Sequence, residues 1–221
     1  MPEPSAASAA PSWPPANGSE QAFELPLFPL RTVLFPGWLL PLKIFEPRYL
    51  DLMVGCLRDR TGFGVVALRE GHEAASTPHP TLFERVGVLA ELVEVDSTQP
   101  GILLVRTRGT RRFRLLSRRQ QADGLWMGEA LLLPIEPPAA LPPERGEVAQ
   151  ALERAITALA EQGVEPFFEP HRLGDAGWVA DRWCEVLPMP LAAKQRLMEE
   201  VDPLQRIAVV EEVLRGERPM G

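Results

Sequence analysis

The hydrophobic and polar positions between residues 23 and 60 predict extended chain followed by a helix. Apolar positions alternate from Phe23 to Phe28, the period of a strand, and its prolines confine such a strand to a sheet edge or to the strand's own ends. Pro36 and Gly37 lie between two apolar runs and predict a turn between two extended segments. Pro47 suits the first position of a helix. The apolar positions predicted to share one face of this helix are Leu50, Met53, Val54 and Leu57.

The chain from residue 63 to residue 133 has the pattern of short strands. The apolar run from Phe63 to Leu68 predicts a buried strand, and the polar segment from Glu70 to Pro80 predicts a mobile loop. From Phe83 to Leu133, apolar runs alternate with turn residues at roughly ten-residue spacing. Several short strands with one inserted helix favour a small barrel-like sheet that is closed on itself.

Prolines and then a helical period mark the rest of the chain. Residues 134–146 are rich in proline and predict a semi-rigid linker. Beyond the linker, apolar residues repeat at helical spacing, and Asp175 and Asp202 are the predicted N-caps of two helices. The sequence therefore predicts an α+β protein with a disordered tail (1–22), a β-barrel domain (23–133), the linker, and a helical bundle subdomain (147–221).

Composition limits the class of protein. The chain has 221 residues, enough for one sizeable core or two modest ones, and a net charge of −7, which disfavours a dedicated nucleic-acid binder. Cys56 and Cys184 have no CxxC spacing and no histidine cluster, so we expect two buried thiols in a reducing compartment. The N-terminus lacks the features of a secretory signal, and prolines interrupt the apolar stretch from Leu25 to Leu50 too often for a membrane span. These features predict a cytoplasmic protein with no membrane partner.

The sequence carries no recognisable motif for catalysis, metal binding or cofactor binding. It has no GxxxxGK[ST] phosphate loop and no GxSxG nucleophile motif. His72 and Glu73 begin like a zinc-protease motif, but position 76 is Ser76 rather than histidine, and the pair lies in the predicted loop. We therefore predict no catalytic residue, no metal ligand and no cofactor, and a protein that is not an enzyme.

One local feature departs from the acidic average. The predicted hairpin from Arg106 to Arg119 carries seven arginines: Arg106, Arg108, Arg111, Arg112, Arg114, Arg118 and Arg119. A basic hairpin can clamp phosphates, with Phe113 stacked on a base. In the simpler interpretation the arginines are solvated, some pair with the acidic strand from Glu91 to Asp96, and Phe113 is in the core. The candidate basic contact surface consists of Arg111, Arg112 and Arg114.

Separate stretches of the chain match, in order and spacing, the motifs of one family. They are LPLFPLRTVLFPGWLLPLKIFEPRYLDLM, FGVV, VGVLAEL, GTRRFRLL and LPMPLAAKQRLMEEVDPLQRI. Together, over about Phe23 to Arg215, they resemble the substrate-binding domain of Lon proteases. This resemblance implies a PUA-like pseudobarrel with one inserted helix, followed by a helical subdomain. The residues that match the family motif, which we interpret as mostly architectural, are Phe35, Pro36, Gly37, Phe45, Glu46, Pro47, Arg48 and Tyr49.

The resemblance also implies a function. In Lon this region engages protein substrates and is followed by an ATPase and a serine-lysine peptidase, neither of which this sequence contains, so the resemblance implies a free-standing member. We expect a non-catalytic module that binds exposed polypeptide through an apolar groove or a free strand edge, as an adaptor to a separate protease or chaperone. The alternative is an RNA or nucleotide binder that uses the Arg106–Arg119 hairpin, since PUA-like barrels bind RNA in other families. An enzyme of unknown type is the third hypothesis.

Overall fold

The structure is a computed structural model that describes residue 13 and residues 21–70, 82–164 and 167–216. Within these residues it contains a mostly antiparallel sheet and five α-helices, and is therefore an α+β fold. The strands are β1 (Phe23–Leu30), β2 (Leu39–Ile44), β3 (Phe63–Glu70), β4 (Leu82–Phe83), β5 (Val86–Gln99), β6 (Ile102–Gln120) and β7 (Trp126–Leu132). The helices are α1 (Pro47–Asp59), α2 (Gly146–Glu161), α3 (Ala176–Val186), α4 (Leu191–Glu199) and α5 (Pro203–Leu214), with a 3-10 turn η1 (Pro143–Arg145) before α2.

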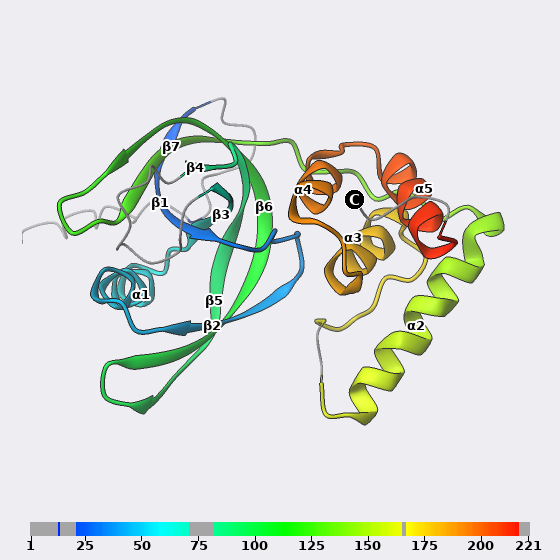
Figure 1. The fold of residues 1–221 in the computed structure, drawn as a ribbon, viewed down its shortest axis with the longest axis horizontal. Helices are drawn as coiled ribbons and strands as arrows, with labels where there is room; N and C mark the ends of the chain where they lie inside the picture. Colours follow the sequence, from blue (N-terminus) through cyan, green and yellow to red (C-terminus); the bar gives the residue numbers. More distant parts are fainter. Residues whose placement is uncertain (1–12, 14–20, 71–81, 165–166, 217–221) are drawn as a thin grey trace, which may run out of the picture.

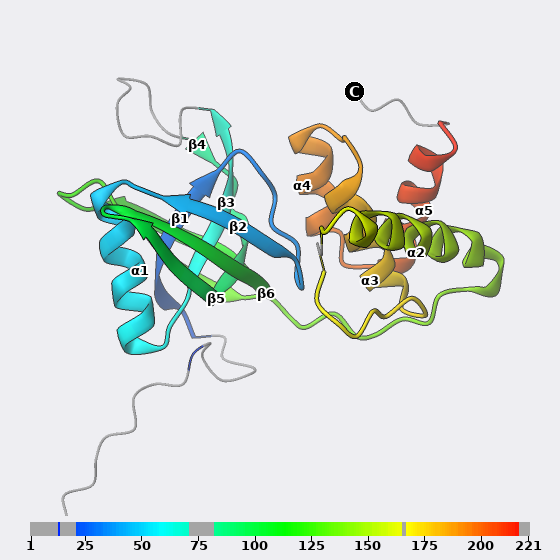
Figure 2. The same ribbon diagram turned by 90° about the horizontal axis from the view of Figure 1, so that it is seen from below.

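Five of the strands form a closed ring of pairings. The neighbours β1-β7-β6-β5-β3 are antiparallel, and β3 returns to β1 through parallel pairs from Leu27 and Gly64 to Leu30 and Ala67. β4 is a short additional partner of β3, and β2 pairs with β6 outside the ring. The ring and α1 lie on one side of the molecule and α2 to α5 on the other (Figure 1 and Figure 2).

β1 is not an edge strand, contrary to the expectation from its prolines. Residues 23–27 pair with β7 and residues 27–30 pair with β3, so the strand has neighbours on both sides. Pro26 lies in the half that pairs only with β7, and Pro29 lies in the half that pairs only with β3. Each proline therefore lies where one side of the strand is locally unpaired, and its missing N–H is tolerated there.

α1 packs against the ring and begins at Pro47, as predicted. The prediction of its apolar face was wrong for Val54 and Leu57, which are 57% and 52% exposed. The helix has two apolar stripes, and hydrophobic periodicity does not say which of them faces the core. The buried hydrophobic residues of the helix are Tyr49, Leu52, Met53 and Cys56.

β6 is one continuous strand of 19 residues, so the segment from Arg106 to Arg119 is not the hairpin that the sequence pattern predicted. A Cβ at Gly109 would lie 2.3 Å from the carbonyl oxygen of Phe35. Glycine at this position therefore allows the turn at Pro36 and Gly37 to lie close to β6. β6 pairs with β5 as far as Arg114, with β2 over residues 103–108 and with β7 over residues 113–120. β6 therefore connects β2 to the ring.

The helical part follows a stretch with little regular structure. Residues 133–142 contain no helix or strand apart from a single bridge between Ala140 and Asp175. Both predicted N-caps are confirmed, because the carboxylates of Asp175 and Asp202 accept hydrogen bonds from the first N–H groups of α3 and α5. One cluster of buried hydrophobic residues includes members of the ring, α1 and the helical part, so the two parts share a core.

Some expectations fall on segments without a described structure. The predicted tail (1–22) and the predicted loop (70–80), including the residues of the zinc-like motif, lie almost entirely outside the described residues. Trp13 is described, and its ring meets that of Phe23 edge-on with the centroids 6.1 Å apart. The domain boundaries at residues 133 and 146 stay predictions.

Candidate functional site

The first family motif, Phe35-Pro36-Gly37, forms a turn where the sheet meets the helices. Phe35 is fully buried, and Gly37 has a φ of +84°, a conformation that favours glycine. The N–H of Gly37 donates to the carbonyl oxygen of Gly109 at 2.7 Å. Arg182 on α3 donates from Nη2 to the carbonyl oxygen of Pro36 at 2.7 Å. The turn therefore connects β6 with α3.

Arg182 is a buried arginine that the sequence analysis missed. Its Nε donates to the carboxylate of Glu185 at 3.0 Å, and its Nη2 donates to the other oxygen of the same carboxylate. Its guanidinium also lies 5.3 Å and 5.5 Å from the ring centroids of Phe167 and Trp178. Burial raises the pKa of Glu185 to about 8, although Arg182 acts to lower it.

The second motif connects α1 to the ring. Arg48 is buried, pairs with Glu46 at 2.8 Å, and donates from Nη1 to the carbonyl oxygen of Gly124 at 2.7 Å. Tyr49 stacks on Phe28 with the ring centroids 4.0 Å apart. These contacts join α1 to β1 and to the turn before β7. The remaining members of the motif are Phe45, which is 60% exposed, and Pro47, which starts α1.

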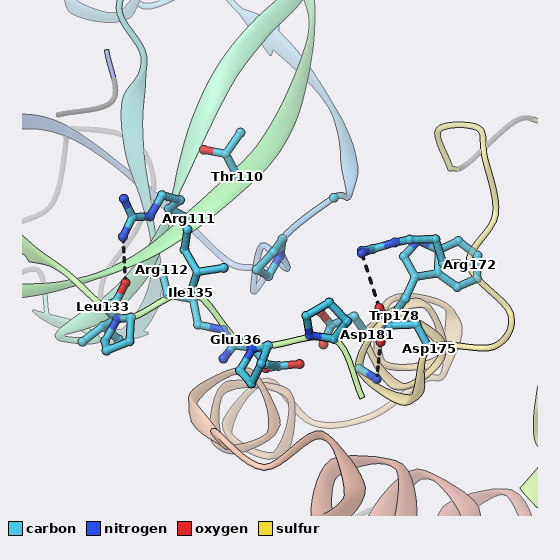
Figure 3. Close-up of a pocket in the computed structure, with 16 residues that line it drawn as sticks. Thr110, Arg111, Arg112, Leu133, Ile135, Glu136, Arg172, Asp175, Trp178 and Asp181 are labelled. Carbon is cyan, nitrogen blue, oxygen red and sulfur yellow. Dashed lines mark hydrogen bonds and ion pairs between the residues drawn. The ribbon is translucent and has the colours of Figure 1, made fainter. Parts of the chain in front are cut away.

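A cleft of about 270 Å³ lies between the ring and the helices (Figure 3). Arg112 pairs with Glu136 at 3.0 Å, and Arg206 on α5 pairs with Asp181 at 2.6 Å and with Glu136. Arg111 is turned towards the segment after β7, where it donates to a main-chain carbonyl oxygen at 3.1 Å. The charged groups of the cleft are therefore paired within the protein.

The carboxylates of this cleft form ion pairs and a helix cap within the protein. Burial raises the pKa of Glu136, while Arg206 and Arg112 act to lower it. Asp175 caps α3 and pairs with Arg172 at 3.3 Å. Among the described residues, no group of three or more His, Cys, Asp or Glu side chains is arranged to hold a metal ion. None of the helices found in those residues has the length and apolar character to cross a membrane.

The arginines of the β5–β6 hairpin do not form one basic surface. Arg106 and Arg108 pair with Glu94 and Glu91 of β5 at 3.0 and 3.5 Å, so the expected pairing with the acidic strand is present. Arg119 pairs with a carboxylate of β1. Three of the seven arginines are therefore paired with carboxylates of neighbouring strands.

The structure also separates the predicted basic contact residues. Arg111 and Arg112 lie in the cleft between the ring and the helices, whereas Arg114 is exposed in a different groove, with Arg118. Phe113, between them in the sequence, is fully buried, as the simpler interpretation of this hairpin predicted. The three arginines therefore do not act on one ligand surface, and only Arg114 faces open solvent.

A second groove, of about 450 Å³ and with a mainly apolar lining, lies along β2, β5 and β6. We call it the β2 groove; its lining residues are Pro41, Leu42, Lys43, Glu94, Asp96, Leu104, Val105 and Arg106. Its two cations match its two carboxylates, so apolar contact is the main interaction that it offers. Leu104 is 42% exposed in it, and the exposed Phe45 follows directly after β2.

Comparison with known proteins assigns the family. The family model of the ATP-dependent protease La (LON) substrate-binding domain matches residues 24–216. The chain belongs to this family. The match covers the ring, α1 and all four helices of the helical part, so both parts of the structure belong to one Lon substrate-binding domain.

Similar curated proteins are mostly Lon proteases. The chain is 29% identical to Lon protease 2 of Myxococcus xanthus, over 97% of this chain and 26% of that protein. It is 27% identical to the Lon protease of Anaeromyxobacter dehalogenans, over 88% of this chain and 23% of that protein. Protein cereblon of Xenopus tropicalis is 30% identical over 50% of this chain and 24% of its own length. The chain thus spans about a quarter of the length of the Lon proteases that it matches.

Solved structures agree with this assignment. The crystal structure of a Lon N-terminal domain protein from Xanthomonas campestris is 33% identical with a TM-score of 0.69, over 89% of this chain and 99% of that one. The N-terminal domain of the Mycobacterium avium complex Lon protease has a TM-score of 0.55 and 16% identity, over 85% of this chain and 96% of that one, which shows the shared fold.

Proposed function

We propose that the protein is a non-catalytic module that binds exposed apolar segments of polypeptides and presents them to a separate protease or chaperone in the cytoplasm. The observation that carries this proposal is the β2 groove, which has a mainly apolar lining and whose strand β2 is followed directly by the exposed Phe45. Membership of the Lon substrate-binding family supports it. The closed ring with one inserted helix is also compatible with the PUA-like pseudobarrel that the family resemblance implies.

Side chains rather than main-chain pairing provide the contact in the β2 groove. β2 pairs only with β6 among the described strands, but Pro41 lies in the middle of β2 and has no N–H to offer an added strand. An apolar client segment instead gains by covering Leu104 and Pro41, which line the groove, and the exposed Phe45. At roughly 25 cal/mol per Å² of apolar surface removed from water, a few such side chains give the weak, reversible binding that a delivering adaptor requires.

We further propose that the family motif is architectural apart from Phe45. Arg48, Tyr49 and the Pro36–Gly37 turn make contacts inside the protein, whereas Phe45 leaves most of its ring in solvent. The exposed ring of Phe45 would add apolar contact area for a bound client.

The test is retention of an unfolded client. Reduced and carboxymethylated lactalbumin is passed over the immobilised protein at low and high salt. We expect retention that changes little with salt. We expect Leu104→Asp to retain at least tenfold less lactalbumin, because a client that covers the new carboxylate must remove it from water. Val201→Asp is the matched control, since Val201 is 72% exposed between α4 and α5. Equal retention by Leu104→Asp and the original protein would refute the proposed site.

A further inference from the structure

The second half of β6 has an unpaired edge. On the side of β5, the last pair joins Val86 and Arg114, and the N–H of Leu115 then donates to the carbonyl oxygen of Arg85 at 2.8 Å. From Leu116 onwards the strand pairs only with β7 within the residues that the structure covers. This edge contains no proline, so its main-chain donors and acceptors are available to another strand.

β4 forms the opposite wall of a slot next to this edge. Within the described chain, β4 pairs only with β3, through Leu82 and Phe83. The space between β4 and β6 is a cavity of about 520 Å³. We call it the β4–β6 slot; its lining residues are Arg69, Leu82, Phe83, Glu84, Arg85, Val86, Arg114, Leu115, Leu116, Ser117, Arg118 and Glu199.

A β-bulge exposes an apolar residue in the slot. The register of β6 against β7 shifts between Leu115 and Ser117, so Leu116 has no partner on β7. Leu116 is 49% exposed, although its neighbour Leu115 is buried. Bulges re-aim side chains at functional edges. The slot thus combines a free strand edge with an exposed leucine.

The slot carries unmatched positive charge. Of its four arginines, Arg69 pairs with Glu84 at 3.5 Å. Arg85 and Arg114 are exposed and have no carboxylate partner among the described residues. Arg118 lies over the ring of Phe83, 4.3 Å from its centroid, which holds the guanidinium at the wall of the slot. Besides the Arg69–Glu84 pair, the slot contains these three arginines and one carboxylate, Glu199, so its net charge is positive in a protein whose net charge is −7.

We propose that the β4–β6 slot binds an extended, acidic segment of polypeptide, which adds as a strand to the free edge of β6. Alternate side chains of an added strand point to the same face, so carboxylates at every second position would meet Arg85, Arg114 and Arg118. A polypeptide fits better than a nucleic acid, because only a polypeptide has the main-chain groups that pair with a strand edge, and the leucine at the bulge offers no contact to phosphate. This inference rests on the proposed polypeptide-binding function, but it uses a site separate from the β2 groove.

The probe for this site is a fluorescein-labelled peptide of twelve residues with alternating glutamate and valine, and binding is measured by fluorescence anisotropy. We expect binding that weakens as salt is raised, and at least tenfold weaker binding of the same peptide with lysine in place of glutamate. The double variant R114E/R118E is expected to bind the acidic peptide at least tenfold more weakly. The double variant R58E/R154E makes the same change of charge on the exposed surfaces of α1 and α2, and is expected to stay within twofold.

Strand addition has its own test. The acidic peptide is N-methylated at every second residue, in both possible registers, which removes main-chain donors without changing side chains. We expect the peptide methylated in one of the two registers to bind at least tenfold more weakly than the unmethylated peptide, because its main-chain donors to β6 are missing. Equal binding of both methylated peptides, or of R114E/R118E and the original protein, would overturn the proposal. Tighter binding of a twelve-nucleotide oligouridylate than of the acidic peptide would overturn it in favour of a nucleic-acid site.

The two experiments together distinguish failure of the slot inference from failure of the proposed function. If the protein retains the unfolded lactalbumin but does not bind the acidic peptide, the slot inference alone is refuted. If it retains neither, both proposals are refuted. If R114E/R118E retains lactalbumin while losing the acidic peptide, the two sites are separate, as we infer.

Discussion

Replacement of Arg182 by methionine tests how the sheet and the helices are joined. Arg182 is 1% exposed and donates hydrogen bonds to the carbonyl oxygen of Pro36 and to the carboxylate of Glu185. Methionine has a similar length but no donor and no charge. The variant R182M therefore leaves a carbonyl oxygen and a carboxyl group buried without their partner.

The two losses contribute differently to the free energy of unfolding. A buried carbonyl left without a donor costs about 1–3 kcal/mol. Breaking a buried ion pair by removing one partner costs about 3–5 kcal/mol when the other charge persists. Burial raises the pKa of Glu185 and Arg182 acts to lower it, so without Arg182 this carboxyl holds a proton and part of the second cost disappears. We expect R182M to lower the free energy of unfolding by about 3–5 kcal/mol in total.

Urea unfolding at pH 7, followed by tryptophan fluorescence, measures this change. The double variant R182M/E185L removes the buried carboxyl as well, and we expect it to recover about 1–2 kcal/mol, because an apolar pair replaces the ionic one. Arg196 on α4 is exposed, and R196M is expected to change stability by no more than about 0.5 kcal/mol. The reasoning is refuted if R182M/E185L is no more stable than R182M, or if R182M resembles R196M.

Three further predictions concern the same core. G37A should lower the free energy of unfolding by at least about 1 kcal/mol more than G101A does, as measured by urea unfolding of both variants. Both glycines have positive φ, but only at Gly37 would a Cβ meet Arg182, at 2.8 Å. The stabilisation that depends on Glu185 should be complete below pH 4.5 and decline as the pH rises towards 8, because the carboxyl of Glu185 keeps its proton to higher pH in the folded state than in the unfolded state. E185Q should therefore reduce the loss of unfolding free energy between pH 5 and 8. An equal loss in E185Q and the original protein would contradict this prediction. Cys56, whose pKa burial raises to about 11, should react with an aromatic disulfide reagent only after denaturation, and fast labelling of the native protein would show that it is accessible.

Local signals in the sequence predicted the elements well. Pro36 with Gly37 marked a turn, Pro47 marked the start of α1, and Asp175 and Asp202 marked two N-caps, because each of these residues acts on its own stretch of backbone. The pairing of the strands was harder to predict from the sequence. The prolines of β1 indicated an edge, but whether a strand is paired on one side or on two along its length depends on residues about 40 and 100 positions away in β3 and β7.

Candidate site residues were harder to predict than the elements, because a charged residue shows no partner in the sequence. Arg112 looked like a ligand for phosphate, yet its carboxylate partner Glu136 lies in the segment that the sequence marked only as a linker. No motif in the sequence pointed to Arg182 or Arg206. One signal was available: α3 is apolar on nearly every side, and a helix of that kind is buried, so any charge that it carries must find a partner inside the protein.

The two proposed surfaces lie on the same strand, and this limits what can occupy both. Leu104 in the β2 groove and Arg118 in the β4–β6 slot are 14 positions apart on β6, which corresponds to at most roughly 45 Å of extended chain. Natural strands average about 5–6 residues, so no ordinary strand of a folded client reaches both places. A chain that has lost its fold does reach both, and its second contact then forms at a high effective concentration. Weak individual sites on one long strand would therefore favour unfolded clients over folded ones, without either site having to recognise the unfolded state itself.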